Sequence, residues 1–183
     1  MVFENQKILP ALRNINRLEK ILSSPFETFV LLDVHISHLA MIRNEAKKHN
    51  KKIIIHADLI HGLKTDDYAA DFLVHDIKPD GIVSTRSNMI LKAKSKKIIA
   101  VQRMFLLDSI ALDKSYSLIE RTQPDYIEIL PGIIPEIIQE VFDKTKIPII
   151  SGGLIRSEKH VKLALDAGAR AVTTSNENLW HIK

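Results

Sequence analysis

Short apolar runs alternate with amphipathic segments along this chain, at a spacing of roughly 20 to 25 residues. Strands joined by helical crossovers run parallel, and such crossovers are right-handed. The alternation therefore predicts a parallel α/β sheet. Seven runs predict its buried strands: 29–34, 53–57, 81–84, 98–101, 126–130, the run from Ile147 to the Gly152-Gly153 pair, and 171–174.

The segments between these runs carry apolar residues three or four positions apart, as amphipathic helices do. Thr65 and Ser157 are predicted to cap two of the helices, and Gly168 stands where the second of these ends. The helices are predicted at about 37–48, 66–75, 88–94, 109–122, from Pro135 onward and at 158–168, with a last helical turn through Leu179 and Trp180.

Residues 8–22 show the same helical period, with Pro10 near the first turn, and predict an amphipathic N-terminal helix. Together with seven strands, this pattern favours a TIM-type β/α barrel of seven or eight parallel strands, built by residues 1–183 as a single domain. Seven is one short of eight, so either the first helix fills the gap or a strand is missing from the count. An open, doubly wound sheet is the alternative.

Composition excludes several classes of protein. The chain is 45% hydrophobic and 26% charged, and no apolar run approaches the ~18 residues of a membrane helix. Residues 1–7 lack the pattern of a secretory signal, and the absence of Cys excludes disulfides and thiolate metal sites. We therefore expect a cytoplasmic protein with no membrane partner. A net charge of +4 weakly favours anionic ligands or nucleic acid.

Two loops at the ends of the last two predicted strands suit a phosphate group. Gly152 and Gly153 lack a Cβ, so their backbone can approach a ligand closely, while Thr173, Thr174 and Ser175 offer hydroxyls and backbone N–H groups. In β/α barrels the phosphate site commonly lies after the last two strands. The alternative is that Gly152-Gly153 forms only a tight turn.

Polar residues gather at the predicted carboxyl ends of the other strands, where barrels bind their ligands. Their carboxylates and imidazoles suit metal binding or acid–base chemistry, but the spacing within each element marks no metal site, and we assign neither a metal nor a cofactor nor a catalytic residue. They suit equally the recognition of a small polyol, with an arginine neutralising an anion, or a purely structural polar layer. The predicted ligand-binding residues are Asp33, His35, His56, Asp58, Arg86, Arg103 and Glu128, together with the glycine and hydroxyl loops.

Two runs of lysines fall where predicted helices meet the next strand, on the opposite face of the barrel. They complement helix dipoles and aid solubility, and they also suit the phosphates of a nucleic acid. The candidates for nucleic-acid contact are Lys47, Lys48, Lys51, Lys52, Lys96 and Lys97.

Several motifs in fixed order resemble the glycerol uptake operon antiterminator regulatory proteins over nearly the whole length. They are 8–14 (ILPALRN), 31–37 (LLDVHIS), 56–59 (HADL), 78–86 (KPDGIVSTR), 102–109 (QRMFLLDS), 126–132 (YIEILPG), 151–156 (SGGLIR) and 173–176 (TTSN). The resemblance implies a cytoplasmic bacterial regulator that senses glycerol 3-phosphate and acts on the leader mRNA of glycerol-utilisation genes. No RNA-binding motif marks the sequence itself, so RNA binding follows from the resemblance alone.

Two functions from different classes stay open at this point. One is a ligand-sensing RNA regulator, and the other is a barrel enzyme that acts on a small phosphorylated metabolite. An acid–base pair with shifted pKa values above the bound polyol would favour the enzyme. Whether the protein forms a homo-oligomer is also open.

Overall fold

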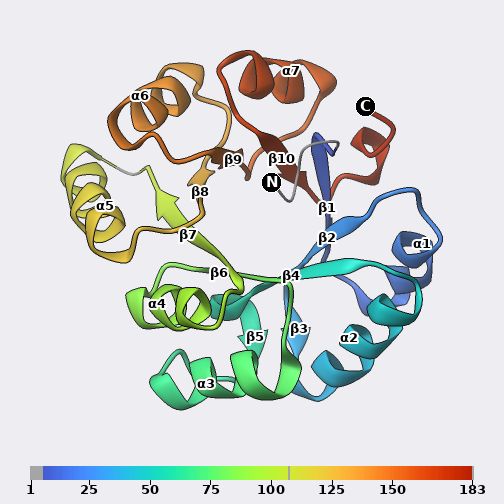
Figure 1. The fold of residues 1–183 in the computed structure, drawn as a ribbon. Coiled ribbons are helices and arrows are strands. Elements are labelled where there is room, and N and C mark those ends of the chain that lie inside the picture. The colour runs from blue at the N-terminus through green and yellow to red at the C-terminus, as the bar shows by residue number, and fades with distance from the viewer. Residues whose placement is uncertain (1–5, 107, 183) are drawn as a thin grey trace.

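Eight parallel strands form a closed barrel in the computed structural model, which describes residues 6–106 and 108–182 (Figure 1). The order around the ring is β1-β10-β9-β8-β7-β6-β4-β2. The predicted TIM-type barrel is therefore confirmed, while residues 1–5, 107 and 183 of the predicted domain lie outside the described part. The barrel strands are β1 (Ile8–Leu12), β2 (Thr28–Leu31), β4 (Lys52–His56), β6 (Gly81–Ser84), β7 (Ile99–Phe105), β8 (Tyr126–Leu130), β9 (Ile149–Ser151) and β10 (Ala171–Thr174).

Helices surround the barrel on its outside (Figure 1). The α-helices are α1 (Leu18–Leu22), α2 (Leu39–Lys48), α3 (Asp67–Phe72), α4 (Ser87–Ser95), α5 (Ser109–Thr122), α6 (Pro135–Thr145) and α7 (Glu158–Asp166). Shorter turns are the 3-10 segments η1 (Ile15–Arg17), η2 (Ile36–His38), η3 (Ala57–Leu59) and η5 (Glu177–Leu179), and the π-helical η4 (Leu73–Ile77). No helix in the described ranges is long and apolar enough to cross a bilayer.

The predicted helix caps are partly confirmed. Ser157 caps α7, and its side chain accepts a hydrogen bond from the backbone N–H of His160. The cap predicted at Thr65 is wrong by one residue, because Asp66 accepts from the N–H of Ala69 at 2.9 Å. Carboxylates and hydroxyls both accept hydrogen bonds from such free N–H groups, so adjacent candidates are hard to separate by sequence.

The helix predicted for residues 8–22 is wrong in its first half. Ile8–Leu12 forms β1, which pairs with β10 on one side and β2 on the other, and it is the eighth strand. All five of its residues are buried, so the strand shows no alternation of apolar and polar residues. Ile8 and Leu12 stand four positions apart, which fits one face of a helix as well. The chain turns helical only at η1 and α1.

The strand predicted at 29–34 ends early. β2 stops at Leu31, and Asp33 has a φ of 53°, in the left-handed region that breaks a strand. The next residues form β3 (Val34–His35), which pairs with β5 (Ile60–His61) in a separate two-stranded sheet.

The two-residue period of the strands divides the barrel interior into layers. One layer is apolar and includes Ile54, Val101, Tyr126 and Ala171. Two positions further along the same four strands, the inward places belong to polar residues, so the barrel becomes polar where its strands end. These residues are His56, Arg103, Glu128 and Thr173.

Candidate functional site

A cavity of about 360 Å³ opens at the end of the barrel where the strands finish. This volume lies at the small end of ligand pockets and suits a small metabolite. Its walls come from the ends of β1, β2, β4, β7, β8 and β10 and from the loops after β9 and β10. They consist of Ala11, Arg13, Val30, Leu32, His56, Leu59, Arg103, Glu128, Leu130, Gly153, Leu154, Ile155, Arg156, Thr173, Thr174 and Ser175.

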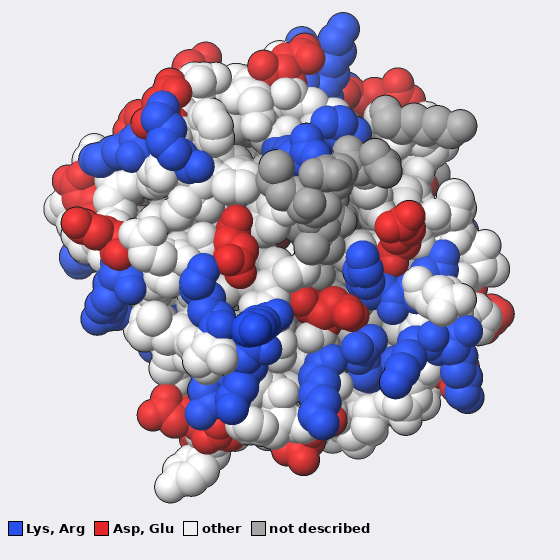
Figure 2. Space-filling view, viewed as in Figure 1, with Lys and Arg blue, Asp and Glu red and all other residues white. Residues whose placement is uncertain are grey.

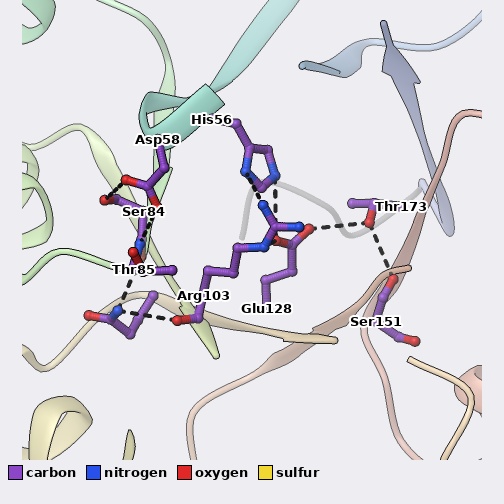
Figure 3. Close-up of polar contacts among 9 residues, drawn as sticks. His56, Asp58, Ser84, Thr85, Arg103, Glu128, Ser151 and Thr173 are labelled. Atoms are coloured by element: carbon purple, nitrogen blue, oxygen red, sulfur yellow. Dashed lines mark hydrogen bonds and ion pairs between the residues drawn. The ribbon is translucent and has the colours of Figure 1, made fainter. Parts of the chain in front are cut away.

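His56, Arg103 and Glu128 converge in this cavity from three strands (Figure 3). Arg103 can only donate hydrogen bonds, so its Nη1 donates to Nδ1 of His56 at 3.1 Å. In the neutral ring the proton then lies on Nε2, which faces Oε2 of Glu128 at 3.4 Å. The arrangement fixes the tautomer of the imidazole.

The carboxyl group of Glu128 is held in its ionised form. Burial alone raises its pKa, but His56, Arg103 and Thr173 together outweigh burial and bring the pKa of Glu128 below its usual value of 4.5. Thr173 contributes a hydrogen bond from its Oγ1 to Oε1 of Glu128 at 3.2 Å. At neutral pH this residue is therefore an acceptor of hydrogen bonds.

Two atoms of this network have no hydrogen-bond partner within the part of the chain that the structure describes. They are Nε of Arg103 and Oε2 of Glu128, which lie 3.5 Å apart. Buried polar atoms seldom stay unpaired. A hydroxyl group is complementary to such a pair, because it accepts from a guanidinium and donates to a carboxylate. Both atoms are buried, so a ligand reaches them only when the side chains around them move.

Gly152 packs against this network, which leaves no space for a side chain at this position. A Cβ on Gly152 would lie 2.4 Å from Oγ1 of Thr173 and 3.2 Å from Oε1 of Glu128, so a side chain there would displace one of them. Its N–H donates to the carbonyl of Ile129 at 3.0 Å and so is not offered to a ligand. Gly152 lies beside the site rather than in the wall of the cavity.

The other predicted phosphate residues do line the cavity: Gly153, Thr173, Thr174 and Ser175. Gly153 has a φ of 70°, and neither its N–H nor that of Ser175 has a hydrogen-bond partner among the described residues. Free backbone N–H groups at a loop of this kind suit an anion.

Arg13 and Arg156 also line the cavity, and neither was predicted from the sequence. Arg13 directly follows β1, so assigning residues 8–22 to a helix concealed that it ends a strand. Arg156 lies five residues after β9, inside the SGGLIR motif that was singled out for its glycines. With Arg103 the cavity has three guanidinium groups against the single carboxylate of Glu128, so its charge favours an anion.

Asp58 and Arg86 lie outside the cavity walls. The Asp58 carboxylate accepts from Oγ of Ser84 at 2.5 Å and from the N–H of Thr85 at 2.7 Å, which ties the loop after β4 to the end of β6 (Figure 3). Arg86 precedes α4, and its N–H donates to Ser84 Oγ at 3.0 Å. Both residues shape the loops near the site and do not face the ligand space.

Asp33 and His35 are also outside it. Asp33 pairs with Nε2 of His61 at 2.6 Å, and both side chains are more than half exposed. Nδ1 of His35 lies 2.8 Å from Oγ of Ser37, beside the two-stranded sheet. No group of three or more His, Cys, Asp and Glu side chains in the described ranges is placed to hold a metal ion.

The candidate lysines lie where strands begin, at the other end of the barrel. Lys47 and Lys48 close α2, Lys52 opens β4, and Lys96 and Lys97 follow α4. Figure 2 shows Lys and Arg side chains gathered in a band over α2 and α4.

Two of the six lysines already have local partners. Lys48 pairs with Glu45 at 2.7 Å, and Nζ of Lys51 donates to the carbonyls of Ser24 and Phe26 at 2.6 and 2.7 Å. The remaining four form no ion pair among the residues described, and we call them the lysine band: Lys47, Lys52, Lys96 and Lys97.

Comparison with known proteins decides the family. The sequence profile of the family described as "Glycerol-3-phosphate responsive antiterminator" matches residues 8–180. The chain belongs to this family. A crystal structure of the glycerol uptake operon antiterminator regulatory protein from Listeria monocytogenes is 48% identical, with a TM-score of 0.97 over 100% of this chain and 99% of that one.

More distant structures share the barrel. A glycerol uptake operon antiterminator-related protein from Thermotoga maritima is 27% identical to this antiterminator-family chain, with a TM-score of 0.83 over 96% of this chain and 98% of that one. A deoxyribose phosphate aldolase from Aeropyrum pernix is 18% identical, with a TM-score of 0.70 over 92% and 85% of the two chains. The likeness to the aldolase concerns the fold alone.

Proposed function

We propose that this protein is a glycerol 3-phosphate-responsive transcription antiterminator that binds the leader mRNA of glycerol-utilisation genes. Glycerol 3-phosphate occupies the cavity at the carboxyl ends of the strands, and RNA contacts the lysine band at the opposite end. The protein catalyses no reaction on the ligand.

The observation that carries the ligand assignment is the unpaired Arg103 Nε and Glu128 Oε2 in a cavity that also contains an anion site. A glycerol hydroxyl bridges these two atoms, while the phosphate accepts from the N–H groups of Gly153 and Ser175 and faces Arg13. A ligand with both a hydroxyl and a phosphate therefore uses the two halves of the site together.

The same geometry argues against the barrel enzyme. A general acid or base needs a pKa near the working pH, whereas the pKa of Glu128 is lowered by His56, Arg103 and Thr173, so its carboxyl group stays ionised. The residues that line the cavity include no lysine, so they offer no amine for a Schiff base of the kind that lyases form with carbonyl substrates.

The RNA assignment is supported by charge and by position. The lysine band has cations without carboxylate partners among the described residues, and such cations neutralise RNA phosphates without a sequence preference. Because the band and the cavity lie at opposite ends of the strands, RNA and glycerol 3-phosphate occupy the protein at the same time. Their effects on each other's affinity are then equal by linkage.

Calorimetric titration of the purified protein with glycerol 3-phosphate, glycerol and inorganic phosphate tests the ligand site. We expect glycerol 3-phosphate to bind at least about ten-fold more tightly than either fragment, because it joins two sets of contacts. Equal affinity for phosphate and glycerol 3-phosphate would remove the hydroxyl site from the proposal.

Leader RNA binding measured at several salt concentrations tests the lysine band. Replacing all four of its lysines with alanine is expected to lower the slope of log K against log salt and to leave glycerol 3-phosphate affinity unchanged. The matched control removes four lysines elsewhere: Lys64, Lys114, Lys159 and Lys162. If the control lowers the slope equally, the effect is one of net charge and the band is not the RNA site.

A further inference from the structure

A second cavity of about 200 Å³ lies beside the ligand cavity. The two share Arg13 and Ser175, and Arg17, Glu177 and Trp180 form much of the remaining wall. We call this second cavity the Trp180 pocket. Its position places any ligand group within it next to the residues assigned to phosphate.

The Trp180 pocket is lined by charged side chains of both signs, which suits a polar ligand group that is attached to an anion. The Glu177 carboxylate is shared between Arg17, whose Nε lies 3.6 Å away, and Nζ of Lys20. The hydrogen bond from Lys20 is the main cause that lowers the pKa of Glu177. Arg13 has no ion pair within residues 6–106 and 108–182, so its charge is available at the border of the two cavities.

Trp180 gives the pocket a fixed wall. Its Nε1 donates to the carbonyl of Thr174 at 3.0 Å, and its ring packs edge-on against Phe26 at 6.5 Å between centroids. Thr174 and Ser175 line the ligand cavity, so the same short segment connects the phosphate residues with the indole.

We propose that the Trp180 pocket is a second subsite and that the protein binds glycerophosphodiesters as well as glycerol 3-phosphate. The inference rests on the proposed function, which puts phosphate at Ser175 and Arg13. These two residues border both cavities, so an alcohol esterified to that phosphate extends into the Trp180 pocket. The glycerol half keeps its place between Arg103 and Glu128.

The second alcohol is a small polyol. The volume of about 200 Å³ limits this alcohol to a small one. The Arg17–Glu177 pair presents a donor and an acceptor 3.6 Å apart, an arrangement that a hydroxyl can bridge. Glycerophosphoglycerol, with a hydroxylated arm on each side of one phosphate, meets both requirements.

The chain contains a single Trp, so its fluorescence reports directly on this pocket. The full-length protein is titrated with glycerol 3-phosphate and with glycerophosphoglycerol, and binding is followed by calorimetry and by Trp180 emission. We expect both to bind and to compete, and the diester to change the emission more strongly.

Arg17→Ala separates the two subsites, and Lys20→Ala is its matched control. Both residues pair with Glu177, but only Arg17 lines the cavity. We expect Arg17→Ala to lower the affinity for glycerophosphoglycerol about ten-fold, which is the effect of one charge-assisted hydrogen bond. The affinity for glycerol 3-phosphate should change less than two-fold. Lys20→Ala is expected to change neither by more than two-fold.

The outcomes distinguish this inference from the proposed function. If glycerol 3-phosphate binds and glycerophosphoglycerol does not, the second subsite is refuted while the proposed function stands. If neither binds, both fail. Equal losses of affinity for both ligands in Arg17→Ala also refute the subsite. If the protein binds no diester and Arg17→Ala loses leader RNA binding, the pocket belongs to RNA and the subsite is refuted as well.

Discussion

Adding one methyl group at Gly152 is expected to disturb the whole ligand network. In Gly152→Ala the new Cβ falls 2.4 Å from Oγ1 of Thr173, where ordinary contacts begin near 3.4 Å. Thr173 must move by roughly an ångström, and its hydrogen bond to Glu128 is lost. Overpacking together with a lost bond to a buried carboxylate gives a destabilisation of roughly 2 to 4 kcal/mol.

Urea unfolding followed by circular dichroism measures this free energy, and a double-mutant cycle tests its cause. Thr173→Ala removes the atom that the new methyl group meets, so the double variant is expected to be more stable than the sum of the two single changes by roughly 1 to 2 kcal/mol. Thr173→Val also removes the hydrogen bond to Glu128 but keeps an atom of similar size in that place, so it should give a smaller rescue, that of the shared hydrogen bond alone. Additive effects in both pairs would refute the reasoning.

Three further predictions concern single side chains. Arg103→Ala should weaken the binding of glycerol 3-phosphate by roughly 1 to 3 kcal/mol, as measured by calorimetry. The wild-type protein should not convert glycerol 3-phosphate, and conversion that is lost in Glu128→Ala would contradict a site that only binds. Because the folded-state pKa of Glu128 lies below 4.5, its contribution to stability is complete above that pH and is lost as the pH falls through the folded pKa. When the pH is lowered below about 4.5, Glu128→Gln should therefore lose less unfolding free energy than the wild-type protein does. Lys51→Ala should destabilise the fold by roughly 1 to 2 kcal/mol in urea, since it removes the donor to two carbonyls, and a neutral result would show that water replaces it.

Strand periodicity predicted much of the barrel and part of the site. Once a strand is placed, its alternation decides which residues point inward, and this is why Arg103 and Glu128 were found from sequence. Asp33 was placed wrongly, because its left-handed backbone turns the chain out of the sheet before the predicted end of the strand.

Other features depended on information that periodicity does not contain. The fully buried β1 has the same apolar content on both faces, so helix and strand were equally compatible with it, and Arg13 was missed as a consequence. The pairing of Asp58 with Ser84 and Thr85 joins the segment after β4 to the end of β6, which no local pattern reveals. The structural reading of Asp58 was among the alternatives that the sequence left open.

The pairing of β1 with β10 has a consequence for how the protein is made. Ile8 lies beside Val172 and Leu9 beside Thr173, so the seam of the barrel joins the earliest and latest strands to leave the ribosome. Most other strand pairs join segments that are synthesised soon after one another, and they can form while translation continues. The seam cannot. Arg13 and Ser175 lie just beyond it, so a nascent chain acquires the phosphate end of its ligand site only after β10 has been synthesised, and before that point the proposed ligand has no complete site through which to stabilise the fold.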